Sequence, residues 1–446
     1  MNKKKKIVSV VGARPNFVKL APIYKALHNF SSSPSSSSSL TSDLTIEHTI
    51  IHTGQHYDYN LSKIFFKEFG IPEPDFNLDV GSGTPGFQIG EMIKRIEKAL
   101  LDNSNNNNNN RNNKKSSNND NNDIDIDLVL VYGDTNSTFA GALAAKNLGI
   151  KVAHVESGLR SFDRRMPEEI NRVLTDHISD YLFAPTQTAV KNLEKEHVYG
   201  KVIYTGDLAV EIVSEAIRLL EATRTTTTGT SSMSTSSSSS SSTSHSILNY
   251  LKLDPKSYIL FTMHRSENTS SEESLTSVIR AFEMLSGQTK LEGWERRAEE
   301  VHTKEGGKGE ETNIKIVFPI HPRTAKLVKA QNLYDRLENC KNLKLIEPVG
   351  YLDFIKLMQN AKKIITDSGG IQKEAYLLSV PCITIRKNTE WVETVNEGWN
   401  ILTDTDTNRI VQATREWMSL PDPSKQNKSI FGDGRTSAII RDFIIA

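Results

Sequence analysis

A serine and two glycines in the last quarter of the chain carry its clearest chemical signature. Ser368, Gly369 and Gly370 follow an apolar run and lead into a pattern typical of an amphipathic helix. The N-terminus of a helix presents unpaired backbone N–H groups and the positive end of the helix dipole, which together favour an anion. Glu374 follows nearly two turns later, where its carboxylate could accept hydrogen bonds from two ribose hydroxyls. The pattern indicates a nucleoside diphosphate, although Ser-Gly-Gly can also be an ordinary strand–helix turn.

Three acidic residues in the first half of the chain are predicted to form an acid/base group. Asp134 follows the apolar run 128–132, Glu156 follows the run 152–155, and Glu168 lies in the first turn of a helical pattern. Neighbouring parallel strands bring their carboxyl ends together, so Asp134 and Glu156 are expected to lie close to each other. Crowded carboxylates raise one another's pKa, so that one can hold a proton while another removes one.

Simpler interpretations exist for some of these acids. Glu168 and Arg172 are four residues apart, which is the spacing of an ion pair on a helix surface. For Glu169 we favour that interpretation and expect a residue on the surface. An isolated polar residue after a strand is usually a helix N-cap. Charged or imidazole side chains follow nearly every predicted strand, however, and capping alone does not explain so many.

Basic residues follow the first strand of each half of the chain. Arg14 and Lys19 lie near the start of the helix predicted for residues 16–28, where positive charge is unfavourable unless an anion is near. Arg14 is predicted to contact a diphosphate, with a structural carboxylate as its alternative partner. In the second half, His264 could assist a departing phosphate by a hydrogen bond or a proton, with Arg265 beside it.

The remaining histidines are weaker candidates. His321 follows a later predicted strand and is a secondary candidate for the same role as His264. His52 and His56 are four residues apart and can mimic a metal site, with Asp58 after them. They lie in a glycine-containing loop rather than on a helix, so no metal is predicted.

Short apolar runs that alternate with helical patterns must position these residues. Continuous apolarity is typical of strands buried on both faces of a parallel sheet. The predicted strands are Ile7–Val11, Thr49–Ile51, Leu128–Tyr132, Val152–Val155, Tyr181–Ala184, Val202–Thr205, Tyr258–Thr262, Ile314–Pro319, Leu343–Ile346, Lys363–Thr366 and Cys382–Ile385. The predicted fold class is α/β, with two doubly wound Rossmann-like domains that face a cleft.

Composition shifts predict the domain boundaries. Runs rich in Ser, Asn or Thr, and one charged Gly-containing stretch, lack the apolar residues needed to offset the entropy of ordering. The predicted parts are an N-terminal domain 1–215 with insertions 31–42 and 103–123, a disordered stretch 216–247 whose Thr/Ser run is 222–247, a C-terminal domain 248–430 with insertion 286–313, and a terminal helix within 431–446. The chain is long enough for two cores of ordinary size.

Composition also excludes several functions. The 54 basic and 54 acidic residues balance, which argues against a nucleic-acid or membrane surface. The run Ile7–Val11 is too short for a signal-peptide core or a membrane span. Cys340 and Cys382 are the only cysteines, and two cysteines give neither a disulfide framework nor a metal site. We therefore expect a reducing, cytoplasmic location.

Together the motifs resemble the non-hydrolysing UDP-N-acetylglucosamine 2-epimerases of bacteria and archaea. In chain order the matching stretches are Gly12–Pro15, Lys19–Pro22, Thr53–His56, Tyr132–Thr135, His154–Arg160, Pro167–Arg172, His264–Arg265, Thr366–Glu374 and Gly432–Gly434. The resemblance implies a GT-B-like architecture, a terminal helix at about 434–445 that crosses back to the first domain, and a homodimer. It implies no cofactor and no metal.

The resemblance also implies the reaction and the roles of residues. UDP would be eliminated across C1–C2 of the sugar and added back after C2 is reprotonated on the opposite face. The implied acid/base residues are Asp134, Glu156 and Glu168, with His264 at the leaving diphosphate. The implied substrate-binding residues are Arg14, Lys19, Gln55, Arg160, Arg265, His321, Phe354, Ser368, Gly369, Gly370 and Glu374.

Two departures from the family pattern affect the expected substrate and regulation. Many members carry Thr-Glu-Arg-Pro-Glu where this chain has Thr389–Glu393 with Trp391, and the change resembles the branch that acts on UDP-2,3-diacetamido-glucuronic acid. The segment Gly81–Gly90 is also unusual. In bacterial members, residues near this segment bind a second, activating substrate molecule, together with the residues that match Gln55, Arg265 and His321. Because the segment differs in this chain, allosteric activation is not expected here.

Three other activities stay open. A glycosyltransferase of the same architecture would share the nucleotide site, but the trio of acids argues against it. A hydrolysing epimerase would release free sugar and UDP. A catalytically inactive sensor would keep the nucleotide site but lose one of the acids, and all three are present.

Overall fold

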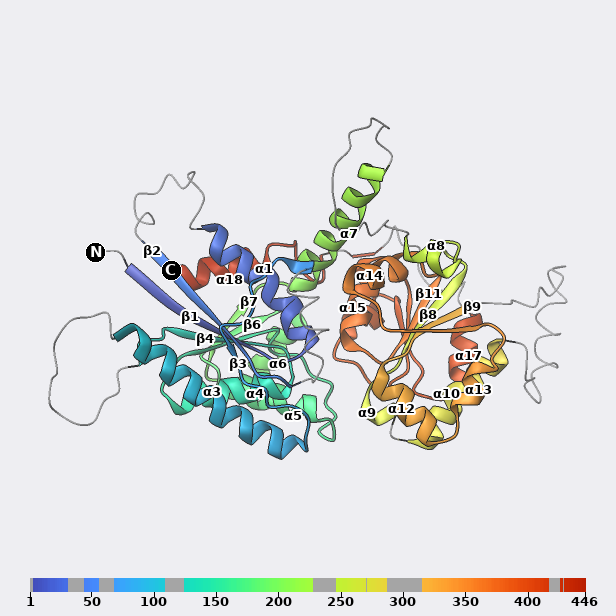
Figure 1. Ribbon diagram of the computed structural model, residues 1–446, viewed down its shortest axis with the longest axis horizontal. Helices are drawn as coiled ribbons and strands as arrows, with labels where there is room; N and C mark the ends of the chain where they lie inside the picture. The colour runs from blue at the N-terminus through green and yellow to red at the C-terminus, as the bar shows by residue number, and fades with distance from the viewer. Residues whose placement is uncertain are drawn as a thin grey trace, which may run out of the picture. The chain divides into compact units, whose positions relative to one another are not determined.

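The structure, a computed structural model, describes residues 3–30, 44–55, 68–108, 124–227, 246–269, 271–286, 315–416, 426–427 and 429–446. The chain forms two compact units, of which the first contains Met1–Ser214 and Lys428–Ala446 and the second contains Glu215–Asn427. Each unit is built on its own sheet (Figure 1).

The first unit has a seven-stranded sheet in the order β3-β2-β1-β4-β5-β6-β7, and all neighbouring strands are parallel. The strands are β1 (Lys3–Val11), β2 (Leu44–His52), β3 (Phe76–Asn77), β4 (Leu128–Tyr132), β5 (Val152–Val155), β6 (Tyr181–Ala184) and β7 (Lys201–Tyr204). The helices are α1 (Arg14–Phe30), α3 (Pro85–Asn108), α4 (Asn136–Asn147), α5 (Pro167–Ile178), α6 (Gln187–Lys195), α7 (Leu208–Thr227), which continues into the second unit, and α18 (Thr436–Ile445). Figure 1 shows α1 and α18 on one face of this sheet and α3, α4 and α5 on the other.

The second unit has a six-stranded parallel sheet in the order β10-β9-β8-β11-β12-β13. The strands are β8 (Tyr258–Thr262), β9 (Lys315–Pro319), β10 (Leu343–Ile346), β11 (Lys363–Thr366), β12 (Cys382–Thr384) and β13 (Asn400–Leu402). The helices are α8 (Ile247–Leu251), α9 (Ser266–Thr269), α10 (Glu272–Leu285), α12 (Pro322–Ala330), α13 (Tyr334–Glu338), α14 (Tyr351–Asn360), α15 (Gly369–Leu377), α16 (Val392–Asn396) and α17 (Thr407–Arg415). Side chains of α10 and α17 form one hydrophobic core with the sheet.

The α/β fold class is confirmed, and the buried strands explain why. All five residues of β4 and all five of β8 are buried, as their continuous apolarity predicted. The sequence did not predict β3 and β13, because runs of two or three residues carry no recognisable periodicity. It also predicted β2 too short, because its first half is polar and only partly buried.

The strand order of each sheet reverses at one point. In the first unit β1 has β2 on one side and β4 on the other, and in the second unit β8 lies between β9 and β11. Ligands of open parallel sheets bind beyond the carboxyl ends of the strands at such a switch point. Arg14 follows β1 and Asp134 follows β4, while His264 follows β8 and Ser368 follows β11.

Two helices extend into stretches that the sequence predicted to be disordered. Helix α3 continues to Asn108 and α7 continues to Thr227, so residues 103–108 and 216–227 are helical instead. Adding a residue to an existing helix costs far less than starting one, so a helix can run on into a polar sequence. The predicted insertion 31–42, and the rest of the other three, lie outside the described residues apart from Ser246, Ile247 and Ser286 at helix ends.

Helix α18 returns the end of the chain to the first unit, where it packs against α1. Among the described helices, none is both long enough and apolar enough to cross a bilayer. Within the same described ranges, no group of three or more His, Cys, Asp or Glu side chains is arranged to hold a metal ion. Of the loop that mimics a metal site, His56 and Asp58 lie outside the described residues.

Candidate active site

The turn between β1 and α1 is held against β4 by close packing and a buried amide. A Cβ atom on Gly12 would collide with the hydroxyl oxygens of Ser137 and Thr53, so only glycine fits there. The Asn16 side chain accepts hydrogen bonds from the backbone N–H groups of Gly12 (3.1 Å) and Ala13 (3.0 Å), and it donates to the Tyr132 carbonyl (2.7 Å). The ends of β1 and β4 are therefore fixed relative to each other.

Lys19 and Glu156 form an ion pair at this fixed edge. The Lys19 Nζ lies 2.7 Å from Oε1 of Glu156, and each side chain is about one-eighth exposed (12%). Gly133, with φ of 67°, leaves space for them, because a Cβ atom there would lie 2.7 Å from the Lys19 Nζ. Arg14 is the first residue of α1 and is exposed. The structure thus brings predicted residues Lys19 and Glu156 together.

Asp134 follows Gly133 at the end of β4. Its Oδ2 accepts a hydrogen bond of 3.1 Å from Nε of the buried Arg172, and its backbone carbonyl accepts one of 3.0 Å from the Asn171 amide. Its side chain remains 30% exposed. Because β4 and β5 are parallel neighbours with Tyr132 opposite Val155, Asp134 and Glu156 both extend from the same edge of the sheet. This arrangement fits the predicted acid/base group.

Glu168 and Glu169 both lie in the first turn of α5. Glu168 is partly exposed there. Glu169 was expected on the surface, but it is only 2% exposed. Its carboxylate accepts hydrogen bonds from Ser161 N (2.9 Å), Phe162 N (2.9 Å) and Arg172 Nη1 (2.7 Å). The surface interpretation of Glu169 is wrong because this turn packs against the loop after β5, whose backbone needs an acceptor.

A fully buried histidine supports the loop that carries Asp134. Nε2 of His154 lies 2.7 Å from the Gly133 carbonyl oxygen, and its Nδ1 lies 2.6 Å from Oδ1 of Asp176. A carbonyl oxygen and an ionised carboxylate can only accept hydrogen bonds. Both ring nitrogens of His154 therefore face acceptors, and the ring links the loop of Asp134 to Asp176.

Arg160 contacts the same buried aspartate, Asp176. It is 3% exposed, donates to Oδ2 of Asp176 (2.7 Å) and forms two hydrogen bonds of 2.7 Å with Glu196. Burial alone would raise the pKa of Asp176, but His154 and Arg160 hold that pKa below its usual value. Burial alone would lower the pKa of Arg160, whereas Glu196 and Asp176 raise it. These contacts favour a structural role for Arg160 over substrate binding.

Gln55 is engaged with the start of α4. Its side-chain oxygen accepts hydrogen bonds from N (3.1 Å) and Oγ (2.6 Å) of Ser137, and its backbone carbonyl accepts one of 3.3 Å from the Gln88 side chain.

In the second unit, His321 is exposed and caps α12, where its Nδ1 accepts a hydrogen bond of 3.2 Å from Arg323 N.

In the second unit a buried aspartate organises the switch point. Asp367 accepts hydrogen bonds from the backbone N–H groups of His264 (3.0 Å to Oδ2) and Arg265 (2.9 Å), and from the Asn268 side chain (3.3 Å). The His264 ring is about half exposed (48%), with its Nδ1 3.4 Å from Asp367. The loop after β8 is therefore fixed to the end of β11, and it presents the imidazole to solvent.

The N-terminus of α15 provides the anion-binding features that the sequence predicted. Ser368 is the N-cap residue, and the structure shows no capping bond from its side chain to the described part of this helix. Nothing lies within 4 Å of a Cβ atom built on Gly370, whereas one on Gly369 would collide with the Glu390 carboxylate. The first turn of α15 is thus open at Gly370 and tightly packed at Gly369.

The side chains predicted to hold a nucleoside come from α14 and α15. Tyr351 donates a hydrogen bond of 3.1 Å to Oε1 of Glu374. Phe354 lies one turn after Tyr351 and is 7% exposed. A carboxylate can accept several hydrogen bonds, so the bond from Tyr351 orients Glu374 without using all of its acceptor capacity.

Buried charges next to α15 escaped the sequence analysis. Glu390 accepts a hydrogen bond of 2.9 Å from Arg386 and lies 3.7 Å from Nη2 of Arg265. Beside it the Trp391 ring, which is 2% exposed, lies under the Lys373 ammonium at 4.3 Å. In the sequence, Trp391 drew attention to this segment because many family members carry arginine at that position. The pairing with Lys373 appears only in the folded chain.

Comparison with known proteins decides the family. The model of the UDP-N-acetylglucosamine 2-epimerase family matches residues 38–106, 120–292 and 301–445. The chain belongs to the UDP-N-acetylglucosamine 2-epimerase family. Membership makes it an isomerase and confirms the resemblance that the motifs indicated.

Relatives of this epimerase family member match it over nearly their whole length. A UDP-N-acetylglucosamine 2-epimerase homolog of Methanococcus maripaludis is 44% identical over 98% of both chains. The UDP-2,3-diacetamido-2,3-dideoxy-D-glucuronate 2-epimerase of Pseudomonas aeruginosa is 34% identical over 98% of this chain and 99% of its own. The crystal structure of Methanocaldococcus jannaschii UDP-GlcNAc 2-epimerase in complex with UDP-GlcNAc and UDP has 37% identity and a TM-score of 0.75, and covers 99% of this chain and 100% of its own.

Proposed function

We propose that this epimerase interconverts UDP-N-acetylglucosamine and UDP-N-acetylmannosamine without net hydrolysis. The observation that carries the proposal is the ion pair of Lys19 and Glu156 beside Asp134 at the switch point of the first unit. Relatives named for UDP-N-acetylglucosamine, at 44% and 37% identity, support the choice of substrate.

The nucleotide is held by residues of the second unit. The open first turn of α15 at Ser368 and Gly370 binds the diphosphate through its backbone N–H groups. Glu374, oriented by Tyr351, accepts the ribose hydroxyls. Phe354 supports the nucleoside from α14. His264, half exposed and aligned by Asp367, hydrogen-bonds the leaving phosphate.

The reaction consists of an elimination and its reversal. A carboxylate removes the C2 proton, the C1–O bond breaks with its electron pair on the β-phosphate, and a C1–C2 double bond forms. A second acid then returns a proton to the opposite face of C2, and the phosphate oxygen of UDP bonds again to C1. Asp134, Glu156 and Glu168 are the proposed acid and base residues. Lys19 holds the Glu156 carboxylate in an ion pair.

A second candidate substrate is UDP-2,3-diacetamido-2,3-dideoxy-glucuronic acid. The epimerase of Pseudomonas aeruginosa named for that sugar is 34% identical to this chain. Trp391, whose ring lies under the Lys373 ammonium, stands where many family members have arginine. The same elimination chemistry applies, because both sugars carry an acetamido group at C2.

Incubation in deuterated water tests the proposal. With UDP-N-acetylglucosamine we expect deuterium at C2 of the recovered UDP-sugars, and UDP-N-acetylmannosamine as a product, by NMR and mass spectrometry. Free sugar that accumulates in equal amount with UDP would show a hydrolysing epimerase instead. Exchange only with the diacetamido-uronic substrate would select the second candidate, and no exchange without an acceptor would favour a transferase.

We also propose that the enzyme is a homodimer in a reducing, cytoplasmic compartment. Family resemblance supports the dimer. Both cysteines, Cys340 and Cys382, are buried and not bridged to each other, as expected of a chain that needs no disulfide. Light scattering of the purified chain would measure its mass, and a monomer would contradict the first part.

A further inference from the structure

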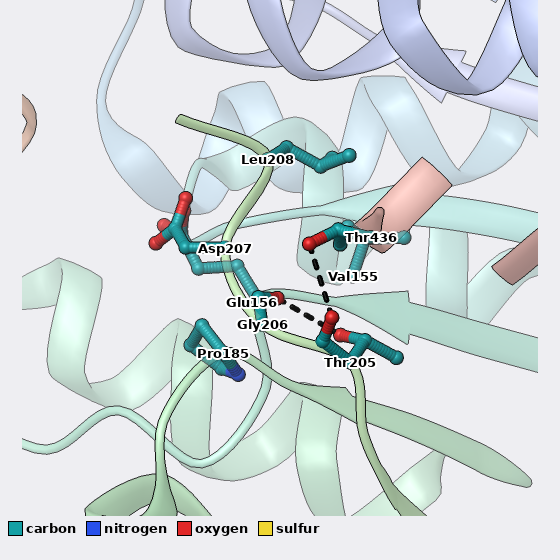
Figure 2. A pocket seen from close by; sticks show the side chains of 8 residues that line it. All are labelled: Val155, Glu156, Pro185, Thr205, Gly206, Asp207, Leu208 and Thr436. Atoms are coloured by element: carbon teal, nitrogen blue, oxygen red, sulfur yellow. Dashed lines mark hydrogen bonds between the residues drawn. The ribbon is translucent and has the colours of Figure 1, made fainter. Parts of the chain in front are cut away.

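A small pocket adjoins Glu156 in the first unit, where β5, β6 and β7 end (Figure 2). Val155, Pro185 and Leu208 supply its apolar lining, and Glu156 borders it. The proposed mechanism uses Glu156 but none of these apolar residues. The pocket therefore needs an explanation of its own.

The wall of the pocket is built from two distant parts of the chain. Gly206 has φ of 79°, and a Cβ atom there would lie 3.0 Å from the Phe431 carbonyl oxygen. The N–H of Asp207 donates to that carbonyl (2.8 Å), and Oγ1 of Thr436 donates to the Thr205 carbonyl (3.0 Å). These bonds fix the end of β7 to the segment that begins α18, so the pocket is a defined feature of the fold.

The polar atoms around the pocket are mostly occupied by the protein itself. The hydroxyl of Thr205 donates to the Gly206 carbonyl (3.0 Å), and the hydroxyl of Thr436 donates to the Thr205 carbonyl, as the dashed lines in Figure 2 mark. Oδ1 of Asp207 accepts from Ala209 N (2.7 Å). The side chains of Val155, Pro185 and Leu208 form the apolar part of the lining, so the pocket has room for a small apolar group against them.

The size of the pocket fits a substituent and not a whole ligand. The centres of water-sized spheres can occupy about 10 Å³ of it. That is close to the ~10–15 Å³ that a cavity needs to hold one water. A single methyl-sized group fits, and a longer substituent does not.

We propose that this pocket between Pro185 and Leu208 binds the methyl end of the substrate's 2-acetamido group and so selects N-acetyl sugars. The inference rests on the proposed function, in which Glu156 acts at C2. The acetamido nitrogen is bonded to C2, so an acid that exchanges the C2 proton must have the acetamido group beside it. The apolar pocket next to Glu156 is where the methyl group then lies.

The test changes the pocket and varies the acyl group. Leu208→Ala enlarges the pocket and Leu208→Phe fills it. Leu220→Ala, about three turns farther along α7, is the matched control. For each full-length variant, affinities for UDP-N-acetyl-, N-propanoyl- and N-butanoylglucosamine are measured by calorimetry, together with rates of C2 deuterium exchange. UDP alone serves as the reference ligand.

We expect wild type to prefer the acetyl over the butanoyl substrate by about tenfold or more, since one methylene in an apolar pocket is worth ~10-fold or more. Leu208→Ala should erase most of that preference, and Leu208→Phe should weaken the acetyl substrate about tenfold, with UDP affinity unchanged in both. Equal effects of Leu208→Ala on all three acyl substrates, in affinity and in rate, would overturn the subsite. If acyl preference shifts in affinity while no variant exchanges C2 hydrogen, the subsite stands and the proposed reaction fails.

Discussion

Glu156 has a backbone conformation that its side chain does not favour. Its φ of 71° lies in the left-handed region, although it is neither glycine nor asparagine. The conformation is held by hydrogen bonds of 3.1 Å from the backbone N–H groups of Glu156 and Ser157 to the Phe183 carbonyl, and by the ion pair with Lys19. Such strain costs about 1–3 kcal/mol and collects at functional sites.

The roles of the three acids can be tested one residue at a time. Asp134→Asn, Glu156→Gln and Glu168→Gln should each lower turnover by about 10²–10⁴-fold, because each removes a group that moves a proton. The affinity for UDP should change far less, since its proposed contacts lie in the second unit. Coupled assay of epimerisation and calorimetry with UDP give the two quantities.

Glu194→Gln is the control for these variants, because Glu194 is an exposed glutamate on α6 and should keep wild-type turnover. Near-normal turnover in all three acid variants would remove the proposed catalytic assignment. Loss of UDP affinity equal to the loss of turnover would instead assign the acids to binding.

At the scale of elements, strand β11 carries a buried lysine at the end opposite to the candidate site. Lys363 is the first residue of β11 and is 1% exposed, and its ammonium group contacts the Thr414 carbonyl at the end of α17. Burial, with a smaller effect of Lys362, lowers the pKa of Lys363 from 10.5 to about 7. The group is therefore a source of pH-dependent stability.

The sign of this dependence follows from the proton count. Between about pH 7 and 10.5 the unfolded chain binds the lysine proton more tightly than the folded chain, so the free energy of unfolding should rise with pH. The slope is at most about 1.4 kcal/mol per pH unit. Lys363→Met should flatten this dependence of the free energy of unfolding on pH between pH 7 and 9.

The four tryptophans all belong to the second unit, so denaturation followed by their fluorescence reports on this unit. Lys362→Met, at the exposed neighbour, should keep most of the slope; an unchanged slope in Lys363→Met would refute the assignment.

The elements themselves were largely predictable, and the exceptions share one cause. Strands such as β4 and β8 are apolar throughout because both faces are covered, so local composition identifies them. The short strands β3 and β13 exist because neighbours already in place offer them hydrogen bonds. The extra length of α3 comes from a helix that has already begun. Each exception depends on structure that has already formed, in a neighbouring strand or in the same helix, and the composition of the short segment alone does not contain it.

At the scale of the whole molecule, the candidate site was only partly predictable. Charged residues after the strands pointed to Asp134, Glu156 and His264, because parallel sheets place strand ends at one edge. Asp176, the buried partner of His154 below Asp134, was not singled out, since burial of a charge depends on which distant residue meets it. Glu169 was misjudged for the same reason.

The return of the chain end to the first unit leads to a last prediction. The Phe443 ring of α18 packs against Tyr181 and Phe183 of β6, with ring centroids 4.9 and 5.5 Å apart. Phe443 is partly buried, so Phe443→Ala should cost about 1–3 kcal/mol, less than the loss of a fully buried ring. Because 1.4 kcal/mol corresponds to tenfold, amide hydrogen exchange in β6 should accelerate by about 5- to 140-fold. Asp442→Ala, exposed on the same helix, should leave that exchange near wild type. Unchanged protection of β6 in Phe443→Ala would mean that α18 contributes no stability to the sheet it covers.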